Sequence, residues 1–182
     1  MDIKYMELKE ASLTYDLFVP FHRHQEVKKC WRKEDNNWIL KEIAFIEEWN
    51  KEEKEYLAEC LKNTIKTDGK VCGSFYNGEL IGFVSVEKEM FGSKKQYVEL
   101  TSLHISEEYR GKGVGKQLFQ MAQKYCLEFG ASKLYISAHS SQETQAFYKA
   151  MGCVEAEEYN MAAVEKEPCD CQLECLAKFD GN

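Results

Sequence analysis

Proline is scarce in this sequence, with only two residues in 182. No stretch rich in glycine and serine, low-complexity tract or internal repeat separates one part of the chain from another. The length of 182 residues, with 44% apolar and 30% charged side chains, fits one globular domain with its own core. We therefore expect a single domain over residues 1–182.

Long apolar runs are also missing. Residues 1–10 alternate charged and apolar side chains instead of forming the apolar segment of a signal peptide. No run approaches the roughly 18 to 20 apolar residues that a membrane-spanning helix requires. We expect a soluble, cytoplasmic protein with no membrane partner, either a monomer or a homodimer.

Positive charge is in deficit, because 24 lysines and arginines face 31 aspartates and glutamates and leave a net charge of −7. A nucleic-acid-binding protein is expected to present a basic face, so we exclude nucleic acid as the main partner. An acidic surface is compatible with a cationic substrate, although a solvated acidic face is the alternative interpretation. The acidic residues that gather in one region are Glu155, Glu157, Glu158, Glu165 and Glu167.

The eight cysteines are interpreted as reduced thiols, because the chain shows no export signal. Cys169, Cys171 and Cys175 form the one local cluster. This cluster lacks a Cys-x-x-Cys pair and a nearby histidine, and its alternation is typical of a strand. We expect no metal site.

The first third of the chain is predicted to be mostly helical after one strand. Residues 3–8 have strand character, whereas from Ser12 to Lys66 apolar side chains recur every three or four residues, as on a helix. Asp35-Asn36-Asn37 is interpreted as a break with capping residues before the next helix. The apolar positions behind this prediction are Ile39, Ile43, Ile46, Leu57 and Leu61.

The rest of the chain mixes strands and helices. Asn77-Gly78 predicts a tight hairpin turn between strands over residues 71–76 and 80–87. A strand over residues 96–105, a helix over 116–129, a strand over 133–138, a helix over 142–151 and closing strands from Cys153 and over Gln172–Phe179 follow. This order predicts an α/β protein with a mixed, mostly antiparallel central sheet of six or seven strands and helices on both faces.

Three glycines lie in the stretch from Arg110 to Gly115, between a predicted strand and a predicted helix. Glycine adopts positive φ and lets the backbone approach a ligand closely. A helix that begins directly after the loop points free N–H groups and its positive dipole end at the same place. We interpret the stretch as a cradle for an anion such as a pyrophosphate. The alternative is that the glycines serve turn geometry alone.

Two familiar phosphate-binding patterns do not fit this loop. The Walker pattern fails because Arg110 occupies the position of its first glycine and Gln117 the position of its serine or threonine. The dinucleotide fingerprint fails because Lys116 replaces its third glycine. The form that does fit, Arg-x-x-Gly-x-Gly, resembles the acyl-coenzyme A pyrophosphate loop of the GNAT superfamily of N-acetyltransferases.

A second motif strengthens this resemblance. Phe147-Tyr148-Lys149-Ala150-Met151-Gly152 is similar to the family's Phe-Tyr-x-x-x-Gly signature, with Cys153 in place of the usual aromatic residue. Glu107 replaces a usual proline before the glycine loop, and Ser141 stands where many members carry a cofactor-contacting asparagine. The resemblance covers roughly residues 70–155.

The resemblance implies that the chain is an acyltransferase with acetyl-CoA as co-substrate. The expected reaction is direct attack on acetyl-CoA, in a ternary complex, by the primary amine of a small molecule such as a polyamine, an antibiotic or an amino-acid-like compound. Two alternatives stay open: a catalytically weak acyl-CoA-binding sensor with the GNAT fold, or an acetyltransferase for protein lysines or N-termini.

The resemblance also implies site residues. Glu99 is the first choice for general base, and Tyr148 for the general acid that protonates the leaving thiolate. Strand alternation puts His104, a competing base, on the face opposite Glu99 and Leu103, and His139 is a further possibility. A backbone amide near Leu103 or Ile105 is expected to hold the thioester carbonyl. The full expected cofactor-binding set is Leu103, His104, Ile105, Arg110, Gly111, Lys112, Gly113, Val114, Gly115, Lys116 and Ser141.

Overall fold

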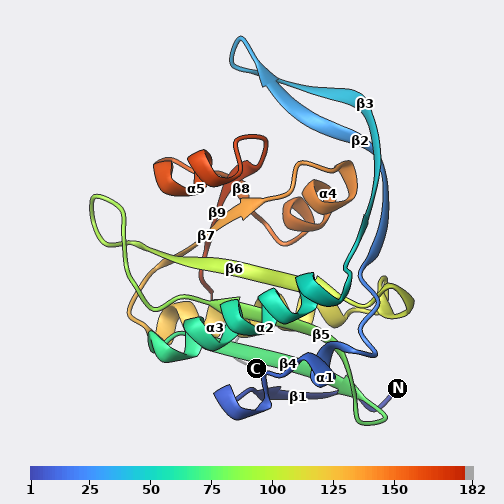
Figure 1. Ribbon diagram of the computed structural model, residues 1–182. Coiled ribbons are helices and arrows are strands. Elements are labelled where there is room, and N and C mark those ends of the chain that lie inside the picture. The colour runs from blue at the N-terminus through green and yellow to red at the C-terminus, as the bar shows by residue number, and fades with distance from the viewer. Residues whose placement is uncertain (179–182) are drawn as a thin grey trace.

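The computed structural model describes residues 1–178 and contains one seven-stranded sheet (Figure 1). The strands lie in the order β1-β4-β5-β6-β7-β9-β8, and every neighbouring pair is antiparallel except β6 and β7. The predicted mixed, mostly antiparallel α/β sheet is thereby confirmed. The seven strands are β1 (Lys4–Glu7), β4 (Lys70–Tyr76), β5 (Glu79–Val86), β6 (Tyr97–Ile105), β7 (Lys133–Ala138), β8 (Val154–Glu155) and β9 (Cys171–Leu176).

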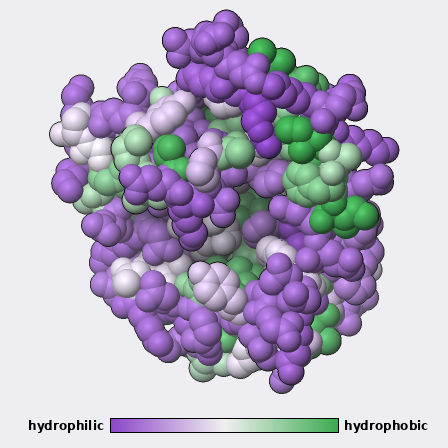
Figure 2. Space-filling model, turned by 45° about the horizontal axis from the view of Figure 1, so that its top comes forward, coloured by the Kyte–Doolittle hydropathy of each residue, from purple (hydrophilic) through white to green (hydrophobic). Residues whose placement is uncertain are grey.

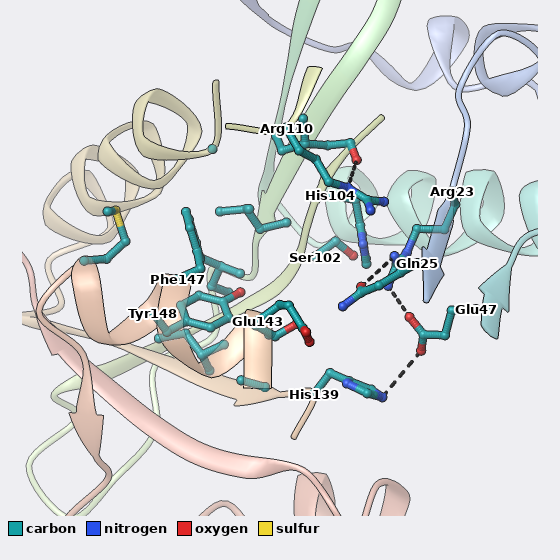
Figure 3. A pocket seen from close by; sticks show the side chains of 18 of the residues that line it. Arg23, Gln25, Glu47, Ser102, His104, Arg110, His139, Glu143, Phe147 and Tyr148 are labelled. Atoms are coloured by element: carbon teal, nitrogen blue, oxygen red, sulfur yellow. Dashed lines mark hydrogen bonds and ion pairs between the residues drawn. The ribbon is translucent and has the colours of Figure 1, made fainter. Parts of the chain in front are cut away.

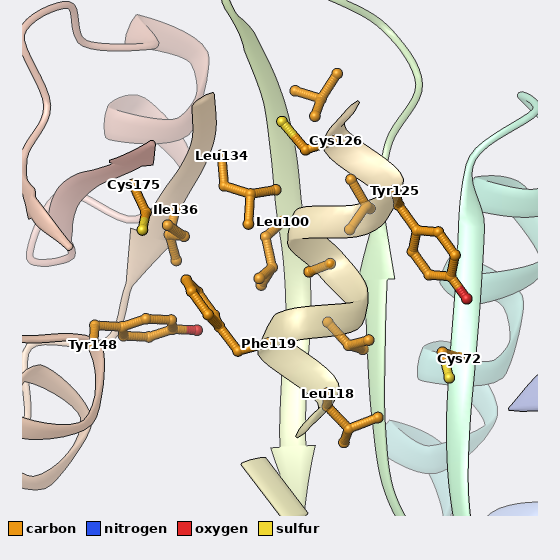
Figure 4. Close-up of a cluster of buried hydrophobic side chains, with 14 of the residues drawn as sticks. Cys72, Leu100, Leu118, Phe119, Tyr125, Cys126, Leu134, Ile136, Tyr148 and Cys175 are labelled. Atoms are coloured by element: carbon orange, nitrogen blue, oxygen red, sulfur yellow. The ribbon is translucent and has the colours of Figure 1, made fainter. Parts of the chain in front are cut away.

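Helices cover both faces of this sheet, as predicted. Helix α3 (Val114–Glu128) packs on β4 to β7 and contributes Leu118, Phe119 and Tyr125 to a buried apolar cluster (Figure 4). Helices α1 (Tyr15–Phe18) and α2 (Lys51–Lys66) pack on the opposite face. Val84 faces α3 and its neighbour Phe83 faces α1, because successive strand residues point to opposite faces.

The helical prediction for residues 12–66 is wrong over most of its length. Strands β2 (His24–Glu34) and β3 (Asn37–Glu48) form a long antiparallel hairpin there, and only α2 is a long helix. Asp35 and Asn36 have φ values of 48° and 64°, so they form the tight turn of this hairpin and do not cap a helix. Asn50 and Glu53 form a capping box at the start of α2.

The β2–β3 hairpin projects beyond the central sheet and passes beside α4 (Gln142–Ala150) (Figure 1). Its attachment is through the main chain: Trp31 N donates to Ser140 O at 2.8 Å, and Cys30 forms an isolated bridge with Ser141. The hairpin is therefore held against the end of β7 that precedes α4.

The last part of the described chain completes one edge of the sheet. Helix α5 (Met161–Lys166), which the sequence did not predict, lies between β8 and β9. Cys171 and Cys175 belong to β9, as their alternation predicted. The predicted end of the last strand at Phe179 lies outside the described residues. Two short 3₁₀ turns, Glu10–Ser12 and Glu107–Tyr109, complete the elements.

No helix within residues 1–178 is both long and apolar enough to cross a membrane. All eight cysteines are free thiols, and the same residues contain no grouping of side chains suited to a metal ion.

Candidate active site

A cleft of about 950 Å³ opens where β6 and β7 separate. The two parallel strands pair only from Tyr97 to Glu99 on β6, with Glu99 opposite Tyr135. Beyond this point the strands diverge, and residues 100–105 and 136–138 line opposite walls. Figure 2 shows a largely hydrophilic face with a hollow near its middle.

A β-bulge in β6 changes which side chains share a face. Ser102 pairs with Ser85 and Leu100 with Val86, so Thr101 is an extra residue in the ladder. The bulge shifts the alternation by one position, and Leu100 and Leu103 consequently both face α3. His104 therefore lies on the same face as Glu99, and the sequence prediction that placed these two on opposite faces is wrong.

The main chain of β6 supplies polar groups to the cleft. Ser106 N donates to Ile81 O at 2.8 Å, and antiparallel pairing alternates between residues that bond their partner strand and residues that do not. His104 therefore bonds β5, whereas the N–H groups of Leu103 and Ile105 point toward the gap. Arg110 Nε donates to Ile105 O at 3.2 Å from that side.

The glycine loop closes one end of the cleft. Gly111 and Gly113 have φ values of 72° and 83°, which are strained for other residues, and a Cβ at either would meet nothing within 4 Å. Gly113 is the N-cap of α3, and Gln117 N makes the first bond back to Gly113 O. The N–H groups of residues 114–116 therefore have no acceptor within the helix and are available to an anion.

The side chains of this loop fall into two groups. Arg110 and Lys116 line the cleft and add positive charge. Lys112 lies outside the lining, with its Nζ 5.2 Å from the centre of the Tyr109 ring, and Val114 is buried in the core below α3. The backbone and charge of the loop suit the pyrophosphate of coenzyme A.

Tyr148 projects from α4 into the cleft (Figure 3). Its ring packs against Phe119 and Phe147, with centroids 6.2 and 5.2 Å away, and the residue is 6% exposed. Burial raises the pKa of the phenol well above its usual range, helped by Cys153 and Asp170. The hydroxyl therefore stays protonated near neutral pH and can donate its proton.

His104 is held in an aromatic pocket. Its ring centre is 4.8 Å from that of Trp49 and 5.5 Å from that of Phe83. Burial, with the positive charges of Arg23 and Arg110, lowers the pKa of His104 to about 3. The imidazole is therefore neutral at physiological pH and a weak proton acceptor.

Glu99 and Ser141 lie outside the cleft lining. Glu99 sits where β6 and β7 still pair, and burial together with the charge of Glu87 raises the pKa of its carboxyl. Ser141 is fully buried as the N-cap of α4, where its hydroxyl accepts from Thr144 N at 3.3 Å.

The hairpin brings a second polar group to the cleft, beside His104 and Arg110 (Figure 3). Arg23 donates from Nη1 to Gln25 Oε1 at 2.9 Å and forms an ion pair with Glu47. Glu47 Oε1 also lies 3.5 Å from His139 Nε2. The sequence missed Arg23, Gln25 and Glu47 because it assigned this segment to helices.

His139 has a defined tautomer. Its Nδ1 accepts a hydrogen bond from Ser141 N at 3.1 Å, so the ring proton of the neutral form resides on Nε2. Nε2, which carries that proton, lies 3.5 Å from Glu47 Oε1 and makes no hydrogen bond with it, and the ring has no free nitrogen with which to act as a base. Glu47 is held instead by its ion pair with Arg23.

Comparisons with known proteins agree with this geometry. The sequence model of the acetyltransferase (GNAT) family matches residues 22–153. A protein of Archaeoglobus fulgidus described as an uncharacterized N-acetyltransferase is 35% identical over 54 residues, which make up 29% of this chain and 37% of that protein. The matched segment therefore spans little more than a third of this relative.

Solved structures superimpose over almost the whole chain. Nourseothricin acetyltransferase has a TM-score of 0.70 at 14% identity, covering 98% of this chain and 100% of that one. A putative streptothricin acetyltransferase from Bacillus anthracis, in complex with acetyl coenzyme A, has a TM-score of 0.71 at 16% identity, covering 99% and 100%. PaiA N-acetyltransferase from Thermoplasma acidophilum, in complex with coenzyme A, has a TM-score of 0.61 at 19% identity, covering 97% and 99%.

These structural likenesses, at low identity, confirm the GNAT fold. The family match supports the same assignment from the sequence. It spans the hairpin, the β6–β7 fork, the glycine loop and the Phe147-Tyr148 motif. The chain therefore belongs to the GNAT family of acetyltransferases, enzymes whose acetyl donor is acetyl-CoA.

Proposed function

We propose that this chain transfers the acetyl group of acetyl-CoA to a primary amine of a small molecule, by direct attack in a ternary complex. One observation carries the proposal: the glycine loop and the polar side chains of the hairpin and of the end of β7 line one and the same cleft. Donor and acceptor can therefore meet in the cleft without a covalent enzyme intermediate.

The donor end is suited to coenzyme A. The free N–H groups at the start of α3, with Arg110 and Lys116, provide a positive cradle for the pyrophosphate. The outward N–H groups of Leu103 and Ile105 can hold the thioester carbonyl and stabilise the negative charge that develops on its oxygen.

The acceptor end favours a cationic small molecule. Six carboxylate side chains line the cleft, against three arginine and lysine side chains. The names of two similar structures refer to the antibiotics nourseothricin and streptothricin, which supports an antibiotic-like amine as one class to test. Apart from Glu107 beside the glycine loop, the acidic side chains of the lining are Glu26, Glu47, Glu143, Glu167 and Asp170.

Proton transfer completes the proposed reaction. Tyr148 is the proposed general acid, because its neutral phenol reaches the cleft and can protonate the departing thiolate. A carboxylate near the fork is the proposed base. Glu99 is the sequence candidate, and from the closed end of the fork it would act through a water molecule.

The proposal is tested by following free-thiol release from acetyl-CoA with a panel of amines. The panel contains polyamines, aminoglycosides, streptothricin-like compounds, amino acids and lysine peptides. We expect saturable thiol release with at least one small cationic amine and little with lysine peptides. Calorimetric acetyl-CoA binding without thiol release for any amine would instead indicate an acyl-CoA sensor.

A further inference from the structure

Asp170 lies at the open end of the β6–β7 fork. It directly precedes β9, whose first residue, Cys171, pairs with Ala138 at the end of β7. Because β6 and β7 have already separated at this level, the Asp170 side chain lines the cleft, whereas Glu99 does not. Of these two carboxylates, Asp170 is therefore the one that a substrate in the cleft can contact.

A directional chain of hydrogen bonds holds the Asp170 carboxylate. The Tyr135 hydroxyl donates to Gln172 Oε1, which orients the amide so that Nε2 donates to Ser137 Oγ at 3.0 Å. Ser137 then donates its single hydroxyl proton to Asp170 Oδ2 at 3.3 Å. Tyr135 and Gln172 are buried, so the chain is anchored in the sheet.

This arrangement leaves the second carboxylate oxygen for a ligand. Asp170 Oδ1 has no hydrogen-bond partner within residues 1–178, while Oδ2 is fixed by Ser137. A carboxylate with one oxygen fixed and the other facing a cleft is suited to receive a proton from a bound ammonium group.

The surrounding charges favour proton acceptance by Asp170. Burial raises the pKa of this carboxyl, and the charges of Glu167 on its own loop and Glu47 on β3 act in the same direction. His139, at the end of β7, acts in the opposite direction. From α4, Tyr148 lies close enough that the charge of Asp170 contributes to its raised pKa. The proposed acid and Asp170 therefore face the same part of the cleft.

We propose that Asp170 binds the acceptor ammonium and removes its proton, a role that rests on the proposed acetyl transfer. Asp170 takes one proton, which leaves a lone pair on the amine nitrogen. This lone pair forms the N–C bond to the thioester carbonyl carbon. The C–S bond then breaks, and the Tyr148 phenol gives its proton to the thiolate sulfur. The second proton lost from nitrogen returns through water to Tyr148, and the proton on Asp170 leaves to solvent.

The test compares three variants of the full chain: Asp170→Asn, Glu99→Gln and the exposed control Glu165→Gln. Asparagine keeps the shape and can still accept from Ser137, but it cannot take a proton. With the polyamine spermidine, or the most active amine of the panel, we expect Asp170→Asn to lower kcat about 10² to 10³-fold. Acetyl-CoA affinity, measured by calorimetry, is expected to change less than about twofold, because Asp170 lies at the acceptor end.

A second acceptor separates proton removal from positioning. Hydroxylamine is mostly uncharged at pH 7.5, so its attack on the thioester does not require deprotonation of an ammonium group. With hydroxylamine, we expect Asp170→Asn to release thiol at most of the wild-type rate. With the cationic amine, the wild-type rate falls at low pH, and we expect this acid limb of the pH profile to be absent in Asp170→Asn. Equal losses with both acceptors would overturn the assignment of Asp170 as base.

The outcomes distinguish this assignment from the wider proposal. Full activity of Asp170→Asn with the cationic amine, alongside loss in Glu99→Gln, overturns the role of Asp170 and leaves acetyl transfer standing. Absence of thiol release by the wild-type chain with every acceptor overturns both. Loss of activity with the cationic amine in Asp170→Asn alone, while Glu165→Gln stays active, supports the assignment.

Discussion

Gly115 and Phe147 are in direct contact: a Cβ added to Gly115 would lie 3.1 Å from Cε2 of the Phe147 ring. This contact joins the glycine loop to the Phe147-Tyr148 motif of α4. Glycine is therefore needed at position 115 so that the Phe147 ring can approach the backbone, whereas Gly111 and Gly113 are needed because their φ angles are positive. The position of Tyr148 in the cleft depends on this packing.

Replacing Gly115 with valine is expected to destabilise the fold. The valine Cβ would lie 3.1 Å from the Phe147 ring, closer than an ordinary van der Waals contact, and overpacking of this kind costs about 1–3 kcal/mol. Urea unfolding measures the change, with Gln117→Val on the exposed side of the same helix as the control for β-branching. Equal unfolding free energies for the two variants would show that Gly115 is not a contact site.

The charge of the loop is tested by two nearly isosteric variants, Gly113→Asp and Gly113→Asn. Both side chains tolerate positive φ better than most, and the space beside Gly113 is open, so their stabilities should be similar. Only aspartate places a negative charge against the proposed pyrophosphate site. We expect acetyl-CoA to bind the aspartate variant at least about tenfold more weakly than the asparagine variant at low salt, since like charges repel. Equal calorimetric affinities would remove the loop from the binding site.

Tyr148→Phe is expected to separate chemistry from binding. The phenylalanine ring keeps the packing against Phe119 and Phe147 but has no proton to donate. Turnover should fall by about 10²-fold or more, with little change in acetyl-CoA affinity. Steady-state kinetics and calorimetry provide the measurements, with Tyr56→Phe on the exposed surface as control. Parallel losses in both quantities would assign Tyr148 a packing role alone.

The neutral state of His104 predicts a pH dependence of stability. Its pKa is about 3 in the folded protein and 6.5 as the ordinary value, so between these values the unfolded chain binds more protons. The contribution of His104 to the free energy of unfolding is therefore fully present above pH 6.5 and is lost as the pH is lowered toward 3. The loss from this group is at most about 1.4 kcal/mol per pH unit. His104→Gln should flatten the pH dependence of the unfolding free energy between pH 7 and pH 5. An NMR titration of the His104 ring near pH 6.5 would contradict this account.

The glycine loop and the β4–β5 hairpin could be predicted from the sequence because local backbone geometry determines both. Asn77 and Gly78 have the positive φ values, 52° and 85°, that their residue types favour. Helix α3 likewise shows its buried stripe directly in the spacing of its apolar residues.

The β2–β3 hairpin could not be read in this way. Its register shifts between Val27 and Lys29, so β3 contains an extra residue near Ile43 and Ala44. The shift interrupts strict alternation and leaves Ile39, Ile43 and Ile46 at spacings that imitate a helix. The bulge at Thr101 misled the assignment of faces on β6 for the same reason.

The polar network behind Asp170 was also beyond local sequence reasoning. Tyr135, Ser137 and Gln172 come from two strands, and their hydrogen bonds depend on the pairing of β7 with β9. No spacing in the sequence fixes that register.

The central claim is acetyl transfer to a small amine, and the most direct measurement follows both products in one reaction. The chain is incubated with acetyl-CoA and the most active amine of the panel, and free thiol and acetylated amine are quantified together, the latter by mass spectrometry. The account predicts one acetylated amine for each thiol released, with both lost in Tyr148→Phe. Thiol release without acetylated amine would contradict it, because the chain would then hydrolyse acetyl-CoA.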